Sequence, residues 1–326
     1  MHRTFENEGI CYLGNPLIKR DGIRQSFTGE EMSEYGKCMA DPTYFAEKFC
    51  KIISLDTGLV PFKLYPYQDT MFKHFRKNRF SIILACRQSG KSISVCAYLL
   101  WFAIFHADKN IAIIANKGAT AREMLARVTL MLENLPFYIQ PGCKTLNKGT
   151  IKFSNNSKIM AAATSSNSIR GQSINLIYLD EFAFVDNAEA FYTSTYPVIS
   201  SGKTSQVIIT STMNGMGNLF YKLWMGAIQA SNEFKPFRVD WWDVPGRDDK
   251  WKIQTIKNTS QLQFDQEFGN CLWSRSQIRI RINTKEYDIR IGDLHTILTS
   301  GDSCCISLEE KIRRKALCRN NHGEKI

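Results

Sequence analysis

A loop around position 90 could bind the phosphates of a nucleotide. Residues 85–92 read Ala-Cys-Arg-Gln-Ser-Gly-Lys-Ser and directly follow a short apolar run. A loop that ends in Gly-Lys-Ser and opens a helix can direct backbone N–H groups at phosphates, while Lys91 reaches the β- and γ-oxygens and Ser92 reaches Mg²⁺. The usual pattern starts with a glycine where this chain has Ala85, so only the second half of the motif matches. An ordinary surface turn is therefore the alternative.

A pair of acids ninety residues downstream would complete a hydrolytic site. Residues 176–181 read Leu-Ile-Tyr-Leu-Asp-Glu, which indicates an apolar strand that ends in two carboxylates. Asp180 would hold Mg²⁺, and Glu181 would orient and deprotonate the attacking water. The alternative is a strand whose edge carries two solvated acids.

Two further groups could lie close to the γ-phosphate. Thr210, Ser211 and Thr212 follow the apolar run at 207–209, so they are expected at the end of a neighbouring strand, where they could sense hydrolysis. A hydroxyl-rich turn before a helix is the alternative for these three residues. Arg87 lies inside the phosphate loop, where its guanidinium could stabilise transition-state charge or simply be solvated.

Two polar residues outside the motifs could contribute recognition and coupling. Gln68 precedes the loop at a distance suited to reading the adenine edge, with Tyr65 or Tyr67 available to stack on the base. Arg170, before the acidic strand, could couple the nucleotide state to a moving surface or contact DNA. A loop arginine is more often only solvated.

The pattern of elements around these motifs predicts an α/β fold. We expect residues 1–60 to form an N-terminal arm or lid, with a helix over 41–50 and an extended stretch at 59–62. Strands and helices then alternate, which is typical of a mostly parallel sheet with helices on both faces, the architecture of P-loop NTPases. The expected strands are 81–85, 110–115, 150–153, 158–162, 176–179 and 206–210, and the expected helices are 67–79, 91–106, 119–135, 188–196 and 217–230.

Composition narrows the class of protein and its partners. The 326 residues carry a net charge of +11, which favours a polyanionic partner such as nucleic acid, although solvated lysine-rich faces are the alternative. The 10 cysteines are scattered without Cys-x-x-Cys pairs. We therefore expect reduced thiols and no thiolate metal site. The most apolar segment, residues 95–106, is too short to span a bilayer.

These motifs, in this order, resemble the large terminase subunit of tailed phages, in particular that of the myovirus branch. The resemblance runs over about residues 41–270, which would form the ATPase domain from residue 61 onward, and that family typically lacks the first loop glycine and carries an arginine in the loop. It implies ATP and Mg²⁺ as ligands, Arg87 and Glu181 as catalytic residues, and Asp180 as the metal-side acid. The remaining implied ATP-binding residues are Gln68, Gln88, Ser89, Gly90, Lys91 and Ser92, and the implied coupling residues are Thr210, Ser211 and Thr212, to which the sequence reading adds Arg170.

The same resemblance implies the partners of a DNA-packaging motor. They are double-stranded DNA, the portal ring of a procapsid, a small terminase subunit and further copies of this chain in a ring on the portal. Such a protein would work in the host cell cytoplasm and would not need a membrane.

Residues 271–326 depart from the family pattern. Alternating apolar residues on both sides of 283–285 predict a β-hairpin, and a lysine- and arginine-rich tail follows. Cys271 before this hairpin resembles the first residue of an intein, in which it would be the splicing nucleophile. A divergent or frameshifted terminus is the alternative. With 56 residues after position 270, we expect no nuclease domain and no DNA cleavage by this chain alone.

Two other functions stay open at this point. A helicase-like DNA-dependent ATPase could use the same sheet to separate strands instead of translocating duplex DNA. The chain could also be a truncated or intein-bearing precursor that is inactive until it is joined to a second polypeptide.

Overall fold

The computed structural model describes residues 9–164, 169, 171–200, 202–215, 217–269, 277–282, 285–290, 294, 297 and 317–318. The chain forms two compact units, Met1–Gln254 and Thr255–Ile326. Among the described residues, no helix is both long enough and apolar enough to cross a membrane.

An eight-stranded sheet organises the first unit, in the order β12-β5-β11-β10-β6-β9-β8-β7. The strands from β12 to β9 are parallel neighbours, and β8 and β7 continue the sheet antiparallel. The strand β11 lies between β5, which leads into the phosphate loop, and β10, which ends at the acidic pair. The strands are β5 (Phe80–Ala85), β6 (Asn110–Ala115), β7 (Cys143–Asn147), β8 (Thr150–Phe153), β9 (Lys158–Ala163), β10 (Leu176–Asp180), β11 (Gln206–Ser211) and β12 (Lys235–Val239).

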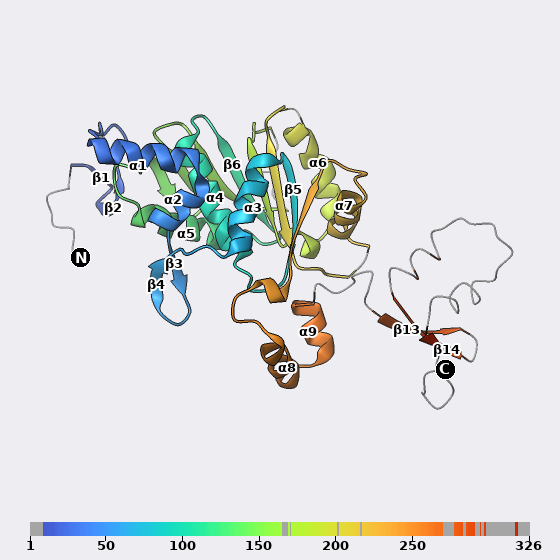
Figure 1. Ribbon diagram of the computed structural model, residues 1–326. Coiled ribbons are helices and arrows are strands. Elements are labelled where there is room, and N and C mark those ends of the chain that lie inside the picture. Colours follow the sequence, from blue (N-terminus) through green and yellow to red (C-terminus); the bar gives the residue numbers. More distant parts are fainter. Residues whose placement is uncertain are drawn as a thin grey trace. The chain divides into compact units, whose positions relative to one another are not determined.

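The central strands are continuous apolar runs, so they are buried on both faces of the sheet. Every residue of β5 and of β10 is buried, as expected for parallel strands covered on both faces. In Figure 1, α3, α4 and α5 lie on one side of the sheet, and α6 and α7 lie on the other. These helices are α3 (Pro66–Lys77), α4 (Lys91–Phe105), α5 (Gly118–Asn134), α6 (Ala188–Ser200) and α7 (Leu219–Ile228). The predicted α/β fold with a mostly parallel sheet is confirmed.

The N-terminal residues belong to the same unit as the sheet, whereas the sequence suggested a separate arm or lid over 1–60. Their elements pack on the central core: Trp101 Nε1 donates to the Cys38 carbonyl at 2.8 Å, and the rings of Phe45 and Phe105 lie 5.6 Å apart, edge to face. These contacts hold the N-terminal elements against α4 within the first unit. The elements are β1 (Cys11–Tyr12), β2 (Asn15–Lys19), α1 (Gly29–Ala40), α2 (Pro42–Phe49), β3 (Lys51–Ser54) and β4 (Gly58–Pro61).

Two local features differ from the expected elements. The helix α1 was not predicted; a capping box at Thr28 and Glu31 fixes its start, with hydrogen bonds of 2.9 and 3.2 Å. The helix α6 was expected to end at residue 196 but continues through Pro197 to Ser200. Proline removes one helical N–H and usually ends or kinks a helix, which is why the expected boundary was early.

The C-terminal elements include the predicted hairpin. The strands β13 (Gln277–Ile282) and β14 (Lys285–Arg290) pair antiparallel, and β15 (Leu317–Cys318) adds to β14. The hairpin prediction is therefore confirmed. Two helices precede it, α8 (Asp249–Asn258) and α9 (Gln261–Glu267).

Candidate nucleotide site

The phosphate loop runs from the end of β5 to the start of α4 and has the backbone of an anion-binding turn. Gln88 and Gly90 have positive φ angles of 55° and 74°, and Ser89 between them does not. Such alternation turns successive N–H groups to one side and makes a concave cradle for an anion. Glycine is favoured here because its φ lies in the left-handed region, and a Cβ at this position would also lie 2.7 Å from Gln68 Nε2.

Lys91 and Glu181 meet at the carboxyl edge of the sheet. Lys91 Nζ lies 2.6 Å from Glu181 Oε1, and the lysine side chain is only 7% exposed against 37% for the glutamate. Glu181 directly follows β10 in a left-handed conformation, with φ of 48° and ψ of 47°. This strained backbone turns its carboxylate back toward the phosphate loop. The two charges compensate one another within the site.

Asp180 is buried, 3% exposed, and its Oδ1 accepts several hydrogen bonds. The donors are Tyr178 OH at 2.6 Å, Thr210 Oγ1 at 3.1 Å and Ser92 Oγ at 3.3 Å. Burial raises the pKa of Asp180 above its ordinary value, and the neighbouring Glu181 acts in the same direction. The structure thus brings Ser92 from α4 and Asp180 from β10 to one point.

The C-terminal end of β11 and the residue after it connect to the acidic pair. Thr210 contacts Asp180, as described, while the backbone N–H of Thr212 donates to Glu181 Oε2 at 3.3 Å. Ser211 Oγ lies 3.5 Å from the same carboxylate oxygen and accepts from the Ala183 N–H at 3.1 Å. All three residues therefore lie at the site, at the end of the strand between the loop and the acids.

Gln68 and Tyr67 lie on the outer side of the phosphate loop. Gln68 is 2% exposed; its Oε1 accepts from the Tyr65 N–H at 2.8 Å, and its Nε2 lies 3.5 Å from the Gly90 carbonyl. Tyr67 OH donates to the Ser89 carbonyl. Both side chains thus support the loop in this structure. Arg87 is exposed on the loop.

Tyr178 is a site residue that the sequence reading missed. It lies two residues before Asp180 on the same face of β10, and the period of two in a strand is the signal that could have found it. Burial raises its pKa well above the ordinary value, so its hydroxyl stays a proton donor to Asp180. Arg170 and Cys271, the proposed coupling and splicing residues, lie outside the described residues.

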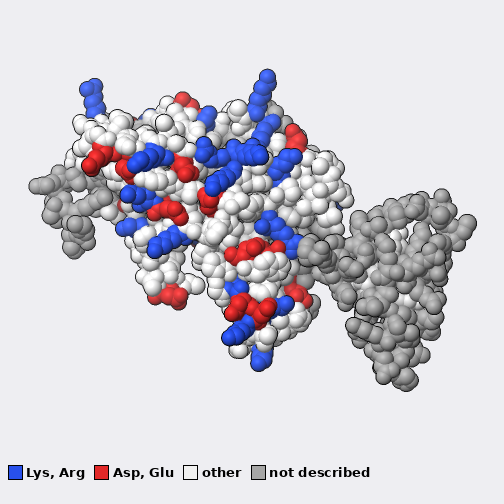
Figure 2. All heavy atoms as spheres, in the orientation of Figure 1, with Lys and Arg blue, Asp and Glu red and all other residues white. Residues whose placement is uncertain are grey.

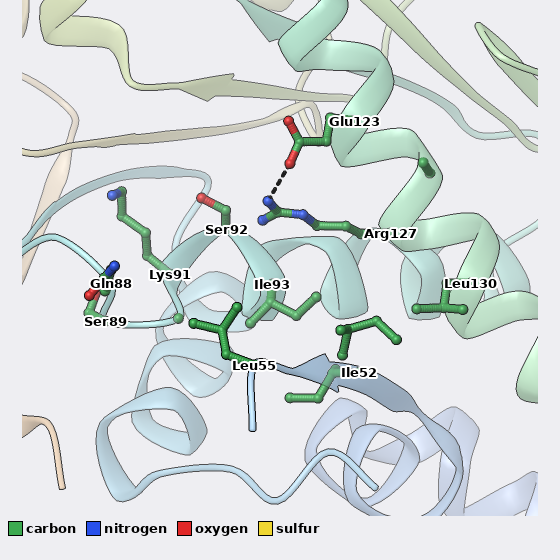
Figure 3. A pocket seen from close by; sticks show the side chains of 13 residues that line it. Ile52, Leu55, Gln88, Ser89, Lys91, Ser92, Ile93, Glu123, Arg127 and Leu130 are labelled. Atoms are coloured by element: carbon green, nitrogen blue, oxygen red, sulfur yellow. Dashed lines mark hydrogen bonds and ion pairs between the residues drawn. The ribbon is translucent and has the colours of Figure 1, made fainter. Parts of the chain in front are cut away.

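A cavity of about 690 Å³ opens beside the loop, a volume in the range of small-molecule sites. Figure 3 shows the loop, β3 and α5 around it, with Leu55 just after the end of β3 and Arg127 pointing from α5 toward Ser92. Arg127 pairs with Glu123 at 2.8 Å. The cavity is lined by residues of the loop, the start of α4, α5, β3 and the turn after β3: Ile52, Ile53, Leu55, Gln88, Ser89, Gly90, Lys91, Ser92, Ile93, Glu123, Ala126, Arg127 and Leu130.

Comparison with known proteins identifies the family. Residues 82–278 match the family described as terminase large subunit, T4likevirus-type, N-terminal. The chain belongs to this family. The match includes the phosphate loop, the acidic strand and residues 210–212 at the end of β11, so the resemblance inferred from the motifs is confirmed.

Solved terminase structures share the fold. The ATPase domain of the Thermus phage P74-26 large terminase superposes with a TM-score of 0.53 at 20% identity, over 64% of this chain and 94% of that domain. The bacteriophage HK97 large terminase gives 0.58 at 16% identity, over 71% of this chain and 54% of its own length. The large terminase of the thermophilic bacteriophage D6E, solved in complex with ADP, gives 0.53 at 13% identity, over 66% and 55%. This chain therefore spans about half the length of the HK97 and D6E proteins.

Proposed function

We propose that this chain hydrolyses ATP as the motor part of a large terminase. The observation that carries the proposal is the 2.6 Å contact between Lys91 Nζ and Glu181 Oε1, at the point where the phosphate loop, β11 and β10 end together. A buried ammonium group, an adjacent partly exposed carboxylate and a cradle of backbone N–H groups are what the cleavage of a phosphoanhydride needs.

Each of these residues would have its own role in the reaction. Lys91 would leave Glu181 for the β- and γ-oxygens of bound ATP, and Glu181 would accept the proton of the attacking water. The new bond forms between the water oxygen and the γ-phosphorus, and the bond to the bridging oxygen breaks, which releases ADP and phosphate. Arg87 would stabilise the charge that develops on the transferred group.

Ser92 and Asp180 fit a magnesium ion. A hydroxyl and a carboxylate held 3.3 Å apart are hard oxygen ligands, and Mg²⁺ usually takes only one or two protein ligands beside phosphate oxygens and waters. Among the described residues no group of three His, Cys, Asp or Glu side chains could hold a metal. When bound, the ion would neutralise charge on the phosphates. Tyr178 and Thr210 keep the Asp180 carboxylate oriented toward Ser92.

Hydrolysis would be coupled to the movement of double-stranded DNA into a procapsid in the host cytoplasm. Membership of the terminase family and the net charge of +11 support this step. On the face in Figure 2 basic and acidic side chains are interspersed, so the net charge alone does not locate a DNA track. Thr210, Ser211 and Thr212 would transmit the loss of the γ-phosphate, because they contact both acids. The portal ring, a small subunit and further copies of the chain would complete the motor.

Replacing Glu181 by glutamine tests the assignment. Glutamine keeps the size and a hydrogen-bonding oxygen but cannot accept the proton, so kcat for ATP should fall by about 10²–10⁴ while ATP binding is retained. Phosphate release is measured with and without double-stranded DNA. Glu189→Gln on α6 is the matched control, since Glu189 pairs only with exposed Lys222 among the contacts described, and it should behave as wild type. A Glu181→Gln protein that hydrolyses ATP at the wild-type rate would show that Glu181 is not the base.

A further inference from the structure

Arg247 reaches the phosphate loop from a distant part of the sequence. It follows β12 and a short 3-10 turn at Trp241–Asp243. Its Nη1 donates to the Arg87 carbonyl at 3.1 Å, and its Nη2 donates to the Gln88 carbonyl at 3.1 Å. Nη1 also lies 3.4 Å from Cys86 Sγ. One guanidinium thus spans two consecutive peptide units of the loop.

These contacts complete a row of donors along the outer side of the loop. The next two carbonyls are also held: that of Ser89 accepts from Tyr67 OH, and that of Gly90 accepts from Ser94 N at 3.1 Å and Ser94 Oγ at 3.0 Å. In a trans peptide the C=O and N–H groups point in opposite directions. When the carbonyls of residues 87–90 are held outward, the N–H groups that follow them face the concave side.

The structure around Arg247 keeps the guanidinium in place. Its Cζ lies 4.8 Å from the ring centroid of Trp251, and the rings of Trp241 and Trp251 are stacked at 6.0 Å. β12 is anchored to the start of the loop, because Cys86 N donates to the Val239 carbonyl at 3.0 Å. The planar fork of an arginine matches two adjacent carbonyls, which the single ammonium of a lysine does not.

We propose that Arg247 is a positioning residue for the triphosphate: it fixes the Arg87–Gln88 part of the loop so that the backbone N–H groups are aligned before the phosphates arrive. The inference rests on the proposed ATP site and extends it to a residue outside every nucleotide-binding motif of the chain. Arg247 acts through the loop backbone, so it contributes to affinity rather than to the chemical step.

The test compares Arg247→Ala and Arg247→Lys with Lys250→Ala in the full chain. Lys250 is an exposed cation three residues away, so this control removes the same charge from the same segment without touching the loop. Equilibrium binding of a fluorescent ATP analogue and the steady-state KM and kcat for ATP are measured below the melting temperature of each variant.

We expect the dissociation constant and KM to rise about tenfold or more in Arg247→Ala, because two charge-assisted hydrogen bonds are lost. Arg247→Lys should be intermediate, kcat should stay within about twofold of wild type, and Lys250→Ala should match wild type. Unchanged ATP affinity in Arg247→Ala would overturn the proposal, and so would a fall in kcat at unchanged KM. A wild-type chain that binds the analogue without hydrolysing it would refute the proposed ATPase while leaving this binding test intact.

Discussion

The two edges of the parallel sheet use polar groups in different ways. At the carboxyl edge, Lys91, Glu181 and Asp180 are charged, close together and paired with one another or with hydroxyl groups. At the amino edge, polar side chains bind the backbone: Arg79 Nε donates to the Ser205 carbonyl at 2.9 Å, and Asn110 Nδ2 donates to the Ser173 carbonyl at 2.8 Å. The carboxyl edge concentrates charged groups that can bind a substrate, and the polar side chains at the amino edge join separate segments of the backbone.

Arg79 and Arg247 make this contrast specific, because both bind backbone carbonyls at opposite ends of β5. Arg79, just before β5, also donates to the Gly202 carbonyl and so holds the segment that leads into β11. Arg247 holds the loop that follows β5. The same chemical contact stabilises the fold at one end and, by our proposal, shapes a binding loop at the other.

Lys91→Ala should give the largest change in function. It removes the buried ammonium that lies 2.6 Å from Glu181, so kcat/KM for ATP should fall by about 10²–10³. The free energy of unfolding should change by less than about 1 kcal/mol, because Glu181 is 37% exposed and water can solvate it. Phosphate-release kinetics and urea unfolding measure the two effects. An active Lys91→Ala protein would remove the basis for calling the carboxyl edge a nucleotide site.

Arg79→Ala should show the opposite pattern. Losing hydrogen bonds from a charged group to two carbonyls should lower the free energy of unfolding by about 2–3 kcal/mol. The KM for ATP should stay at the wild-type value, since Arg79 lies at the far end of β5. Lys77→Ala, an exposed charge removed from the end of α3, is the control and should unfold as wild type does. A raised KM in Arg79→Ala would mean that the two edges are not functionally distinct.

The sequence predicted the residues at the carboxyl edge better than the residues that hold the phosphate loop in place. Lys91, Asp180 and Thr210 follow apolar runs that form adjacent parallel strands, so topology alone brings them together. Arg247 could not be found in this way, because a single arginine 160 residues from the loop has no local pattern; only the tertiary fold places it.

Two other positions show the same limit of local patterns. The helix α1 was missed because a capping box defines its start more strongly than apolar periodicity does, and only Cys38 is buried along it. The spacing of Gln68 predicts an adenine contact, but the direction of its amide depends on the contacts with Gly90 and with Tyr65 at the start of α3. The spacing of residues along the chain predicts at which end of a strand a residue lies. The direction of its buried side chain depends on tertiary packing.

Asp180→Asn should change stability in the opposite direction to Arg79→Ala and so sharpen the comparison, because it should stabilise the protein while lowering its activity. Asparagine keeps an oxygen that can accept from Tyr178, Thr210 and Ser92 but carries no charge to bury. In the presence of a chelator and without nucleotide, we expect the free energy of unfolding at neutral pH to rise by about 1–2 kcal/mol. Magnesium-dependent hydrolysis should fall, by less than in Lys91→Ala.

The pH dependence separates this cause from a change in packing. Burial raises the pKa of Asp180 above 3.8, so ionisation costs the folded state more than the unfolded state. The wild type therefore loses stability as the pH rises from about 3.8 through the raised pKa, and it regains that stability when the pH falls again. The advantage of Asp180→Asn should be larger above the raised pKa of Asp180 and vanish in acid below it, as measured by urea unfolding at several pH values. If the advantage persists unchanged in acid, the gain comes from packing. The burial of the Asp180 charge would then not be the reason why the carboxyl edge is less stable than it could be.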